Sequence, residues 1–288
     1  MVQQRPVAVV VDSSFCIPRE LLQRYGIHVV PQELVVGDRS YRDGVDMEPS
    51  QFYTILQKNQ TLMSTNAPKP VAFYNAFKEA STQAQGILCL TLAATFSSTY
   101  NSARVGAEMA SSGLPGVPVR VIDTRAAAGA AGFVALEAVR AAWDGKDLDA
   151  VAQRAQEMAP KVNLLAFLDT LYYLGRSGRV PKIAVWAGSI LGVKPLAELH
   201  DGEARLVERP RSRAKATQRL VDIMKDRVGD RPVHVNVMHA NSLPDAEALR
   251  QQIASQFNCA ELLLSEFTPV MGAHIGPGLL GLAFYKED

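Results

Sequence analysis

Short apolar runs alternate with longer segments of helical character over most of the first half of the chain. Val7 to Val11 is entirely apolar, and Gly86 to Leu92 is nearly so. Runs of this length that are rich in Val, Ile and Leu predict buried strands, as we also expect for Ile27 to Val36 and Val117 to Ile122. The Ala-rich segment Ala128 to Trp143 predicts a long helix. Strands and helices in alternation predict an α/β fold built on a parallel sheet.

The same alternation resumes after Pro160, where we place a boundary between two domains. A chain of 288 residues reaches the size at which a single core stops growing, so we expect two lobes, residues 1–160 and residues 161–288. Pro244 to Gln256 predicts a helix in the second half. The strands predicted there are Val162–Leu168, Arg231–Met238, Ala260–Leu264 and Leu279–Tyr285.

Three hydroxyl side chains stand where a helix is expected to begin. Ser97, Ser98 and Thr99 follow the apolar run that ends at Leu92, and the segment behind them has helical spacing. Free backbone N–H groups and the positive end of the helix dipole meet at such a position and favour an anion. Ser and Thr are also the preferred helix caps. The pattern therefore indicates either an ordinary N-cap or an anion site.

Polar residues also stand at two other element ends. Asp12 and Ser13 follow the first strand, at the strand end where open parallel sheets bind ligands, although Ser13 is equally suited to capping the next helix. Thr65 and Asn66 lie in a loop that we expect to lead into a helix, because two prolines introduce an amphipathic segment there.

Composition narrows the classes of partner. Apolar residues make up 48% of the chain, and 30 basic against 29 acidic side chains give a net charge of +1. This balance argues against general affinity for nucleic acid or anionic membranes. Three widely separated cysteines argue against a disulfide framework and favour a reducing compartment. Since no apolar run is long enough for a membrane span or a signal-peptide core, we predict a cytoplasmic protein without stable membrane insertion.

The sequence lacks the usual catalytic signatures. Patterns typical of a P-loop, a G-x-S-x-G hydrolase or an H-E-x-x-H zinc enzyme do not occur, and we predict no metal and no cofactor. A Ser-His-Asp site stays possible from Ser97, His274 and Asp12, because geometry rather than chain order defines such sites. Glycines around His274 let the backbone approach another group closely. Arg179 lies in a Gly-punctuated basic turn that suits either a solvated loop or an anion clamp.

Several motifs, taken in order, resemble the DegV family of fatty-acid-binding proteins over nearly the whole chain. The motifs are Asp12-Ser13, Tyr41-Arg42-Asp43, Thr65-Asn66-Ala67-Pro68-Lys69-Pro70, Phe96-Ser97-Ser98-Thr99-Tyr100-Asn101-Ser102-Ala103, Gly178-Arg179-Val180, Arg211 and His274-Ile275-Gly276-Pro277-Gly278. The resemblance implies an N-terminal parallel-sheet α/β/α domain, a C-terminal α/β domain with a mixed sheet, and a ligand tunnel between helices and sheet.

The resemblance also implies roles for individual residues. Thr65, Ser97 and His274 match the positions that hold the fatty acid carboxylate in the family. Arg179 and Arg211 match basic residues that are thought to face the phosphate or the kinase. Binding energy would come from the tail, since about fifteen methylenes at about 0.8 kcal/mol each contribute on the order of 12 kcal/mol before ordering costs. We expect apolar residues in Ile183 to Val193 to be either plain core or part of the tail lining.

We expect Asn66, Ser98, Thr99 and Gly276 to support the carboxylate site through backbone and side-chain polar groups. The chain departs from the family pattern where Asn66 and Lys69 replace serines and where Ser98 replaces a glycine. If the turn required a positive φ at Ser98, its backbone would be strained.

We therefore predict a carrier that encloses one long-chain fatty acid and presents its carboxylate to a separate ATP-dependent kinase, which forms an acyl phosphate. On this interpretation the chain has no catalytic residues of its own. The alternative is a serine hydrolase that acts on acyl esters with Ser97 as nucleophile and His274 as base. A module with a purely structural role is the third option.

Overall fold

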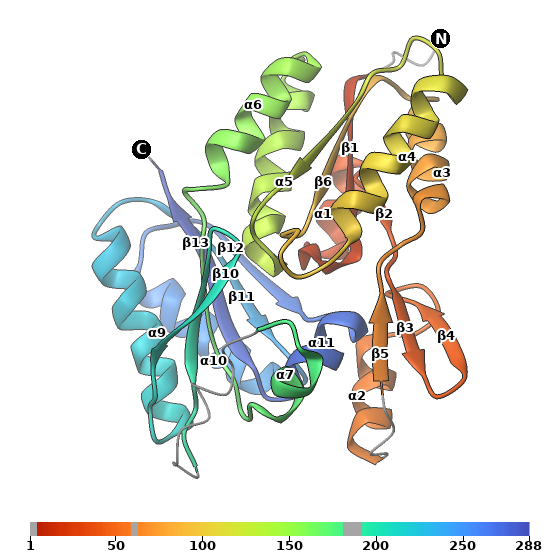
Figure 1. Ribbon diagram of the computed structural model, residues 1–288. Coiled ribbons are helices and arrows are strands. Elements are labelled where there is room, and N and C mark those ends of the chain that lie inside the picture. The colour runs from red at the N-terminus through yellow and green to blue at the C-terminus, as the bar shows by residue number, and fades with distance from the viewer. Residues whose placement is uncertain (1–4, 59–62, 181–191, 288) are drawn as a thin grey trace.

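A computed structural model describes residues 5–58, 63–180 and 192–287, and its strands form three sheets (Figure 1). A four-stranded parallel sheet has the order β2-β1-β6-β7, a six-stranded mixed sheet has the order β10-β9-β8-β13-β11-β12, and a three-stranded antiparallel sheet has the order β4-β3-β5. The predicted fold class, α/β with a parallel sheet and a mixed sheet, is confirmed.

The four-stranded sheet is the centre of a three-layer N-terminal lobe. Its strands are β1 (Arg5–Asp12), β2 (His28–Val30), β6 (Ala84–Thr91) and β7 (Val119–Asp123). The helices around it are α1 (Arg19–Tyr25), α3 (Pro70–Ala80), α4 (Thr99–Gly113), α5 (Ala128–Trp143) and α6 (Leu148–Met158), together with the short 3₁₀ helix η1 (Ser13–Phe15).

Continuous apolar runs form β1 and β6 because both faces of this sheet are covered. Val9 and Leu88 pack on the side of α5 and α6, while Val10 and Ile87 pack on the side of α3 and α4. A strand buried on both faces has no polar alternation, which is why the sequence pattern identified these two strands well.

The three-stranded sheet corrects two sequence expectations. The run from Ile27 to Val36 is two strands in two different sheets, β2 and β3 (Glu33–Val36), separated at Pro31 and Gln32. Strand β4 (Arg39–Arg42) follows β3, and Thr65 and Asn66 lie on β5 (Met63–Asn66) rather than in a loop. Helix α2 (Pro49–Lys58) follows β4.

The six-stranded sheet organises the C-terminal lobe. Its strands are β8 (Asn163–Phe167), β9 (Leu196–His200), β10 (Glu203–Glu208), β11 (Val233–His239), β12 (Cys259–Glu266) and β13 (Leu280–Lys286). The helices are α7 (Tyr172–Ser177), α9 (Arg213–Val228), α10 (Leu243–Gln256) and α11 (Pro269–Ile275).

The two faces of this sheet have different contents. Alternate residues such as Leu165, Phe167 and Leu282 join the cluster formed with α9 and α10. The intervening residues, among them Leu164 and Ala283, belong to a core shared with α5, β1 and β6. That shared core runs from one lobe into the other, so α5 packs between the two sheets (Figure 1). The chain passes from the first lobe to the second between α6 and β8, and we retain residues 1–160 and 161–288 as the proposed domains.

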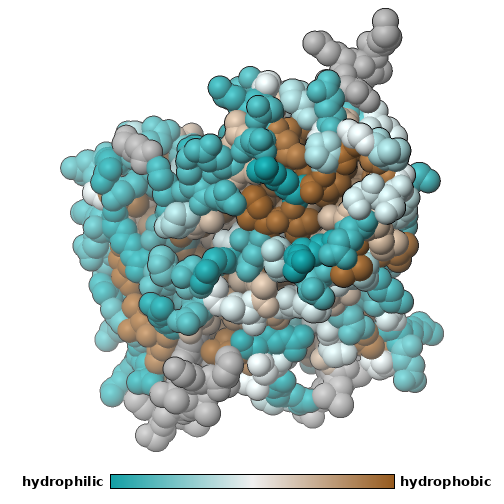
Figure 2. Space-filling model, turned by 45° about the horizontal axis from the view of Figure 1, so that its top comes forward, coloured by the Kyte–Doolittle hydropathy of each residue, from teal (hydrophilic) through white to brown (hydrophobic). Residues whose placement is uncertain are grey.

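One face of the surface is mostly polar. Figure 2 shows hydrophilic side chains over most of this face, with the largest hydrophobic area toward the top of the view and smaller ones at its sides. Within residues 5–58, 63–180 and 192–287, no helix combines the length and the apolar composition that crossing a membrane requires.

Candidate functional site

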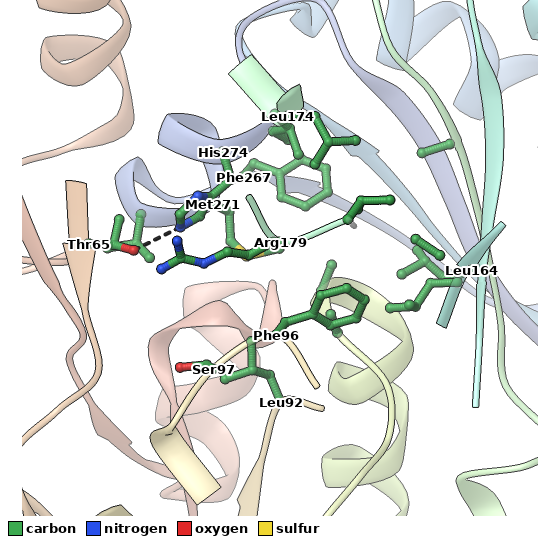
Figure 3. A pocket seen from close by; sticks show the side chains of 18 of the residues that line it. Thr65, Leu92, Phe96, Ser97, Leu164, Leu174, Arg179, Phe267, Met271 and His274 are labelled. Carbon is green, nitrogen blue, oxygen red and sulfur yellow. Dashed lines mark hydrogen bonds between the residues drawn. The ribbon is translucent and has the colours of Figure 1, made fainter. Parts of the chain in front are cut away.

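A cavity of about 420 Å³ lies between the two lobes. Its lining comes from β5, the β6–α4 loop and the start of α5 on one side, and from β8, β9, β10, α7 and α11 on the other. Most lining residues are apolar, whereas Thr65, Ser97, Arg179 and His274 form a polar end opposite Leu164 (Figure 3). The cavity therefore offers an apolar interior with one polar end.

The polar end contains a direct contact between two residues that the sequence singled out. Thr65 Oγ1 lies 2.8 Å from His274 Nε2, in a hydrogen bond whose donor depends on the tautomer of the imidazole. Thr65 is held on β5, where it pairs with Leu34 of β3, and His274 is in the last turn of α11. These two side chains, 209 positions apart in the chain, are brought together by the packing of α11 against β5.

Helix α11 was not expected from the glycines around His274, and it explains why they are needed. A Cβ on Gly272 would lie 2.6 Å from Phe52 of α2, and a Cβ on Gly276 would lie 2.1 Å from Tyr173 of α7. Gly276 also ends the helix with φ +73°, a backbone conformation that favours glycine. The glycines thus let α11 approach its neighbours closely, which fixes the position of His274.

The imidazole of His274 is neutral at ordinary pH. Burial, and to a smaller extent the positive charge of Arg179, lower the pKa of His274 from 6.5 to about 4. Both causes oppose a charged imidazole in the free protein. A neutral ring donates from one nitrogen and accepts at the other, so it can serve a carboxylate as a donor once its tautomer is set.

Ser97 lies at the entrance to α4 and acts as a local cap. Its Oγ accepts a hydrogen bond from the backbone N–H of Thr99 at 3.2 Å and lies 2.8 Å from Thr99 Oγ1. Helix α4 begins at Thr99, two residues later than the first hydroxyl, and Ser98 precedes it with φ −75°. The replacement of glycine by Ser98 therefore causes no backbone strain. Ser97 both caps the helix and lines the cavity.

The remaining predicted residues divide into two groups. Asn66 and Ser98 line the cavity with Thr65 and Ser97. Thr99 is buried behind Ser97, Gly276 packs on Tyr173, and Arg211 is an exposed residue just before α9, so these three are not part of the cavity lining.

Arg179 follows α7 at the edge of the polar end. Its Nη1 donates to the carbonyl of Ser177 at 2.7 Å, and its guanidinium extends toward the Thr65 and His274 pair (Figure 3). Gly178, with φ +66°, ends α7 and turns the chain so that Arg179 reaches this position. A positive charge beside two neutral hydrogen-bonding side chains favours an anion there.

Asp12 has a structural role. Its carboxylate caps η1 by accepting from Ser14, and it also accepts from Gln32 Nε2 at 3.0 Å and from the backbone of Leu92 at 2.9 Å. Ser97 bonds to Thr99 and His274 bonds to Thr65, so among the described residues Asp12, Ser97 and His274 form no hydrogen-bonded chain with one another. The geometry of a Ser-His-Asp site is not assembled.

Some residues of the site were missed at the sequence level. Gln32, Phe267 and Met271 line the cavity, and Arg213 holds the loop behind α11 by donating to the carbonyl of Gly278 at 2.6 Å. The Thr-Pro start and the helical spacing of apolar residues over 270–275 were a usable signal for α11. Of the segment Ile183 to Val193, the structure describes only the last two residues, so its expected part in the lining lies outside the described residues.

Metal binding finds no support in the described part of the chain, where no group of three or more His, Cys, Asp or Glu side chains is arranged around a common point. The fold and the cavity define an α/β protein with room for a largely apolar molecule that has an anionic end.

Comparison with known proteins gives the family. The model of the DegV family, described as uncharacterised proteins, matches residues 6–287. A DegV domain-containing protein of Streptomyces coelicolor is 37% identical over 280 residues, which cover 96% of this chain and 98% of the relative. This chain belongs to the DegV family.

Solved structures agree with that assignment. The structure of a DegV family protein from Thermus thermophilus, described by its fatty acid binding, has a TM-score of 0.89 at 27% identity and covers 99% of this chain and 100% of that chain. DegV from Bacillus subtilis, described as a fatty acid binding protein, has a TM-score of 0.89 at 25% identity, with the same coverage of both chains.

Proposed function

We propose that this protein binds one long-chain fatty acid, with the carboxylate at Thr65, Ser97 and His274 and the tail along the apolar part of the cavity. The observation that carries the proposal is that these three side chains line one and the same cavity, whose other lining residues are mostly apolar. The fatty acid binding described for the proteins from Thermus thermophilus and Bacillus subtilis supports it.

Electrostatics explain how the polar end accepts a charge. A buried carboxylate costs several kcal/mol unless it is hydrogen-bonded, and here the hydroxyls of Thr65 and Ser97 and the imidazole of His274 line one polar end. Asn66 and Ser98 line the same end, Thr99 keeps Ser97 oriented, and Gly276 fixes the helix of His274. The charge of Arg179 balances that of the carboxylate.

We further propose that the protein is a carrier rather than an enzyme, and that a separate ATP-dependent kinase phosphorylates the bound carboxylate. Arg179 would steady the acyl phosphate, and the exposed Arg211 would contact the kinase. Arg211→Ala should keep fatty acid affinity and lose phosphorylation, whereas Arg179→Ala should weaken both because its charge reaches the polar end. Equal loss of binding in both variants would contradict this division of roles.

The direct test is native mass spectrometry of the full chain after purification, followed by identification of the extracted ligand. We expect one unmodified fatty acid per chain. A chain that holds no acyl ligand, and that binds none when palmitate is added after delipidation, would contradict the proposal.

A second measurement separates the carrier from the hydrolase. We expect no burst of p-nitrophenol from a p-nitrophenyl acyl ester, since Ser97 is bonded to Thr99 and not to His274. A burst that disappears in Ser97→Ala would establish the hydrolase instead.

A further inference from the structure

The two ends of the cavity can be ordered along β8. Alternate residues Leu168, Ala166 and Leu164 line the cavity, and the loop behind α11 leads into β13, whose first residue pairs with Phe167. The polar end therefore lies at the carboxyl end of β8, and of the residues labelled in Figure 3 Leu164 lies furthest from it. From Leu168 to Leu164 the strand advances about 13 Å.

Strands β9 and β10 continue the lining beside Leu164. Leu164 pairs with Leu199 of β9, and Leu199 pairs with Ala204 of β10, so these three residues form one row across the sheet. The preceding row contains Ala166 and Ala197 and is smaller. All five residues line the cavity. The room at the far end thus depends on a hairpin, and Ala204 is its outermost lining residue.

The turn of this hairpin is docked on the opposite lobe. Thr95 Oγ1 donates to the carbonyl of Gly202 at 2.6 Å, and the N–H of Gly202 donates to the carbonyl of Arg125 at 2.7 Å. A Cβ on Gly202 would lie 3.2 Å from Thr95 Oγ1, and its φ of +76° favours glycine. The Arg125 and Asp201 side chains also form an ion pair, but both are mostly exposed and contribute little.

The two segments of the N-terminal lobe that contact the turn, around Thr95 and Arg125, also contribute residues to the cavity lining. Phe96 follows Thr95 directly, and Ala127 lies two residues after Arg125. The contacts of the turn therefore hold together the two walls that meet at the far end. Opening the contacts would lengthen the cavity, and filling the space beside them would shorten it.

We infer that the β9–β10 hairpin is the end wall of the cavity and limits the length of the acyl chain, through Ala204 as the residue that sets the space and Thr95 as the residue that holds the wall. This inference rests on the proposed function, because it assigns the tail of the bound fatty acid to the far end.

The test compares dissociation constants for saturated acids from laurate to arachidate, measured on the delipidated full chain. Ala204→Leu adds three carbons to the wall, so the optimum should move toward shorter acids by two to four carbons. Each methylene that no longer fits should weaken binding about fourfold, while shorter acids keep their affinity. Retained binding of the shorter acids shows that the variant is folded. Ala248→Leu, on the exposed face of α10, is the matched control and should leave the length profile unchanged.

Thr95→Val tests the inference from the other side, because it should let the cavity accept longer acids. It removes the hydrogen bond to Gly202 and keeps the size of the side chain, so discrimination against acids longer than the optimum should fall by at least about threefold. Equal weakening at every length in Ala204→Leu, or a profile in Thr95→Val that matches the wild type, would overturn the inference while wild-type palmitate binding still supports the proposed function. A wild-type chain that binds no acid at any length overturns both.

Discussion

The polar and apolar ends of the cavity are built in different ways. At the polar end, Thr65, Ser97 and His274 come from β5, the β6–α4 loop and α11, and each stands in a short motif. At the apolar end, Leu164, Ala197 and Ala204 come from adjacent strands and belong to no motif. The polar end therefore depends on the identity of a few residues. The shape of the apolar end depends on which residues the strand register places side by side.

The largest expected effect is at the polar end. Thr65→Val and His274→Leu each remove a hydrogen bond to the charged carboxylate, which is worth about 1.5–3 kcal/mol, so each should weaken palmitate binding by about tenfold to a hundredfold. Thr54→Val, on the exposed face of α2, is the matched control. Isothermal titration of the delipidated chain measures the effect. Unchanged affinity in both variants would contradict binding of the carboxylate at the polar end.

The second effect concerns the packing that positions His274. Gly276→Ala should lower the free energy of unfolding by at least about 2 kcal/mol more than Gly116→Ala. Both glycines have positive φ, +73° and +86°, but only the Cβ at Gly276 meets a neighbour, Tyr173, whereas nothing lies within 4 Å at Gly116. Chemical denaturation of both variants gives the difference. Equal destabilisation would mean that crowding against α7 does not hold α11 in place.

The third comparison uses two arginines that are close in sequence. Arg213 donates to the carbonyl of Gly278, to Ser242 and to Asp245, whereas Arg211 is exposed. Arg213→Met should cost about 1–3 kcal/mol of stability and weaken palmitate binding several-fold, because it releases the loop behind α11. Arg211→Met should change neither quantity. Thermal unfolding and titration of the two variants check this, and the reverse ranking would contradict it.

The smallest effect is a pH dependence. Because the pKa of His274 is lowered from 6.5 to about 4, the unfolded chain takes up a proton that the folded chain refuses, and stability should fall as pH decreases from about 6.5 to about 4. Asp43 acts in the opposite direction, since burial raises its pKa from 3.8 to about 6 and stability is lost as pH rises through that window.

The His274 contribution is therefore read as a difference between the wild type and His274→Gln. The variant should lose less stability on acidification over that window, as measured by denaturation at several pH values. Parallel pH profiles for the two proteins would show that His274 is not held neutral by its surroundings.

The same contrast explains what the sequence could predict. Strands β1 and β6 were recognised because burial on both faces leaves a continuous apolar run, and helix α5 was predicted with its observed bounds. The single run Ile27 to Val36 was wrong as one strand, because Pro31 and Gln32 break it and Gln32 turns inward to bond Asp12. Local patterning does not encode which sheet a strand joins.

For the candidate site, too, the sequence indicated local features but not the neighbours that the fold brings together. Candidate residues in motifs could be named from the sequence, and the structure places two of them, Thr65 and His274, in contact. The lining of the apolar end could not be predicted, because Ala166, Ala197 and Ala204 become neighbours only through strand register and look ordinary in the sequence. Arg213 was overlooked beside Arg211 for a related reason, since its partners Ser242, Asp245 and Gly278 lie far away in the chain.

The most direct test of the central claim is a crystal structure of the full chain with palmitate. We predict the carboxylate within hydrogen-bonding distance of Thr65, Ser97 and His274, and the end of the tail beside Leu164. A carboxylate located at Leu164, or palmitate bound outside the cavity, would contradict the account.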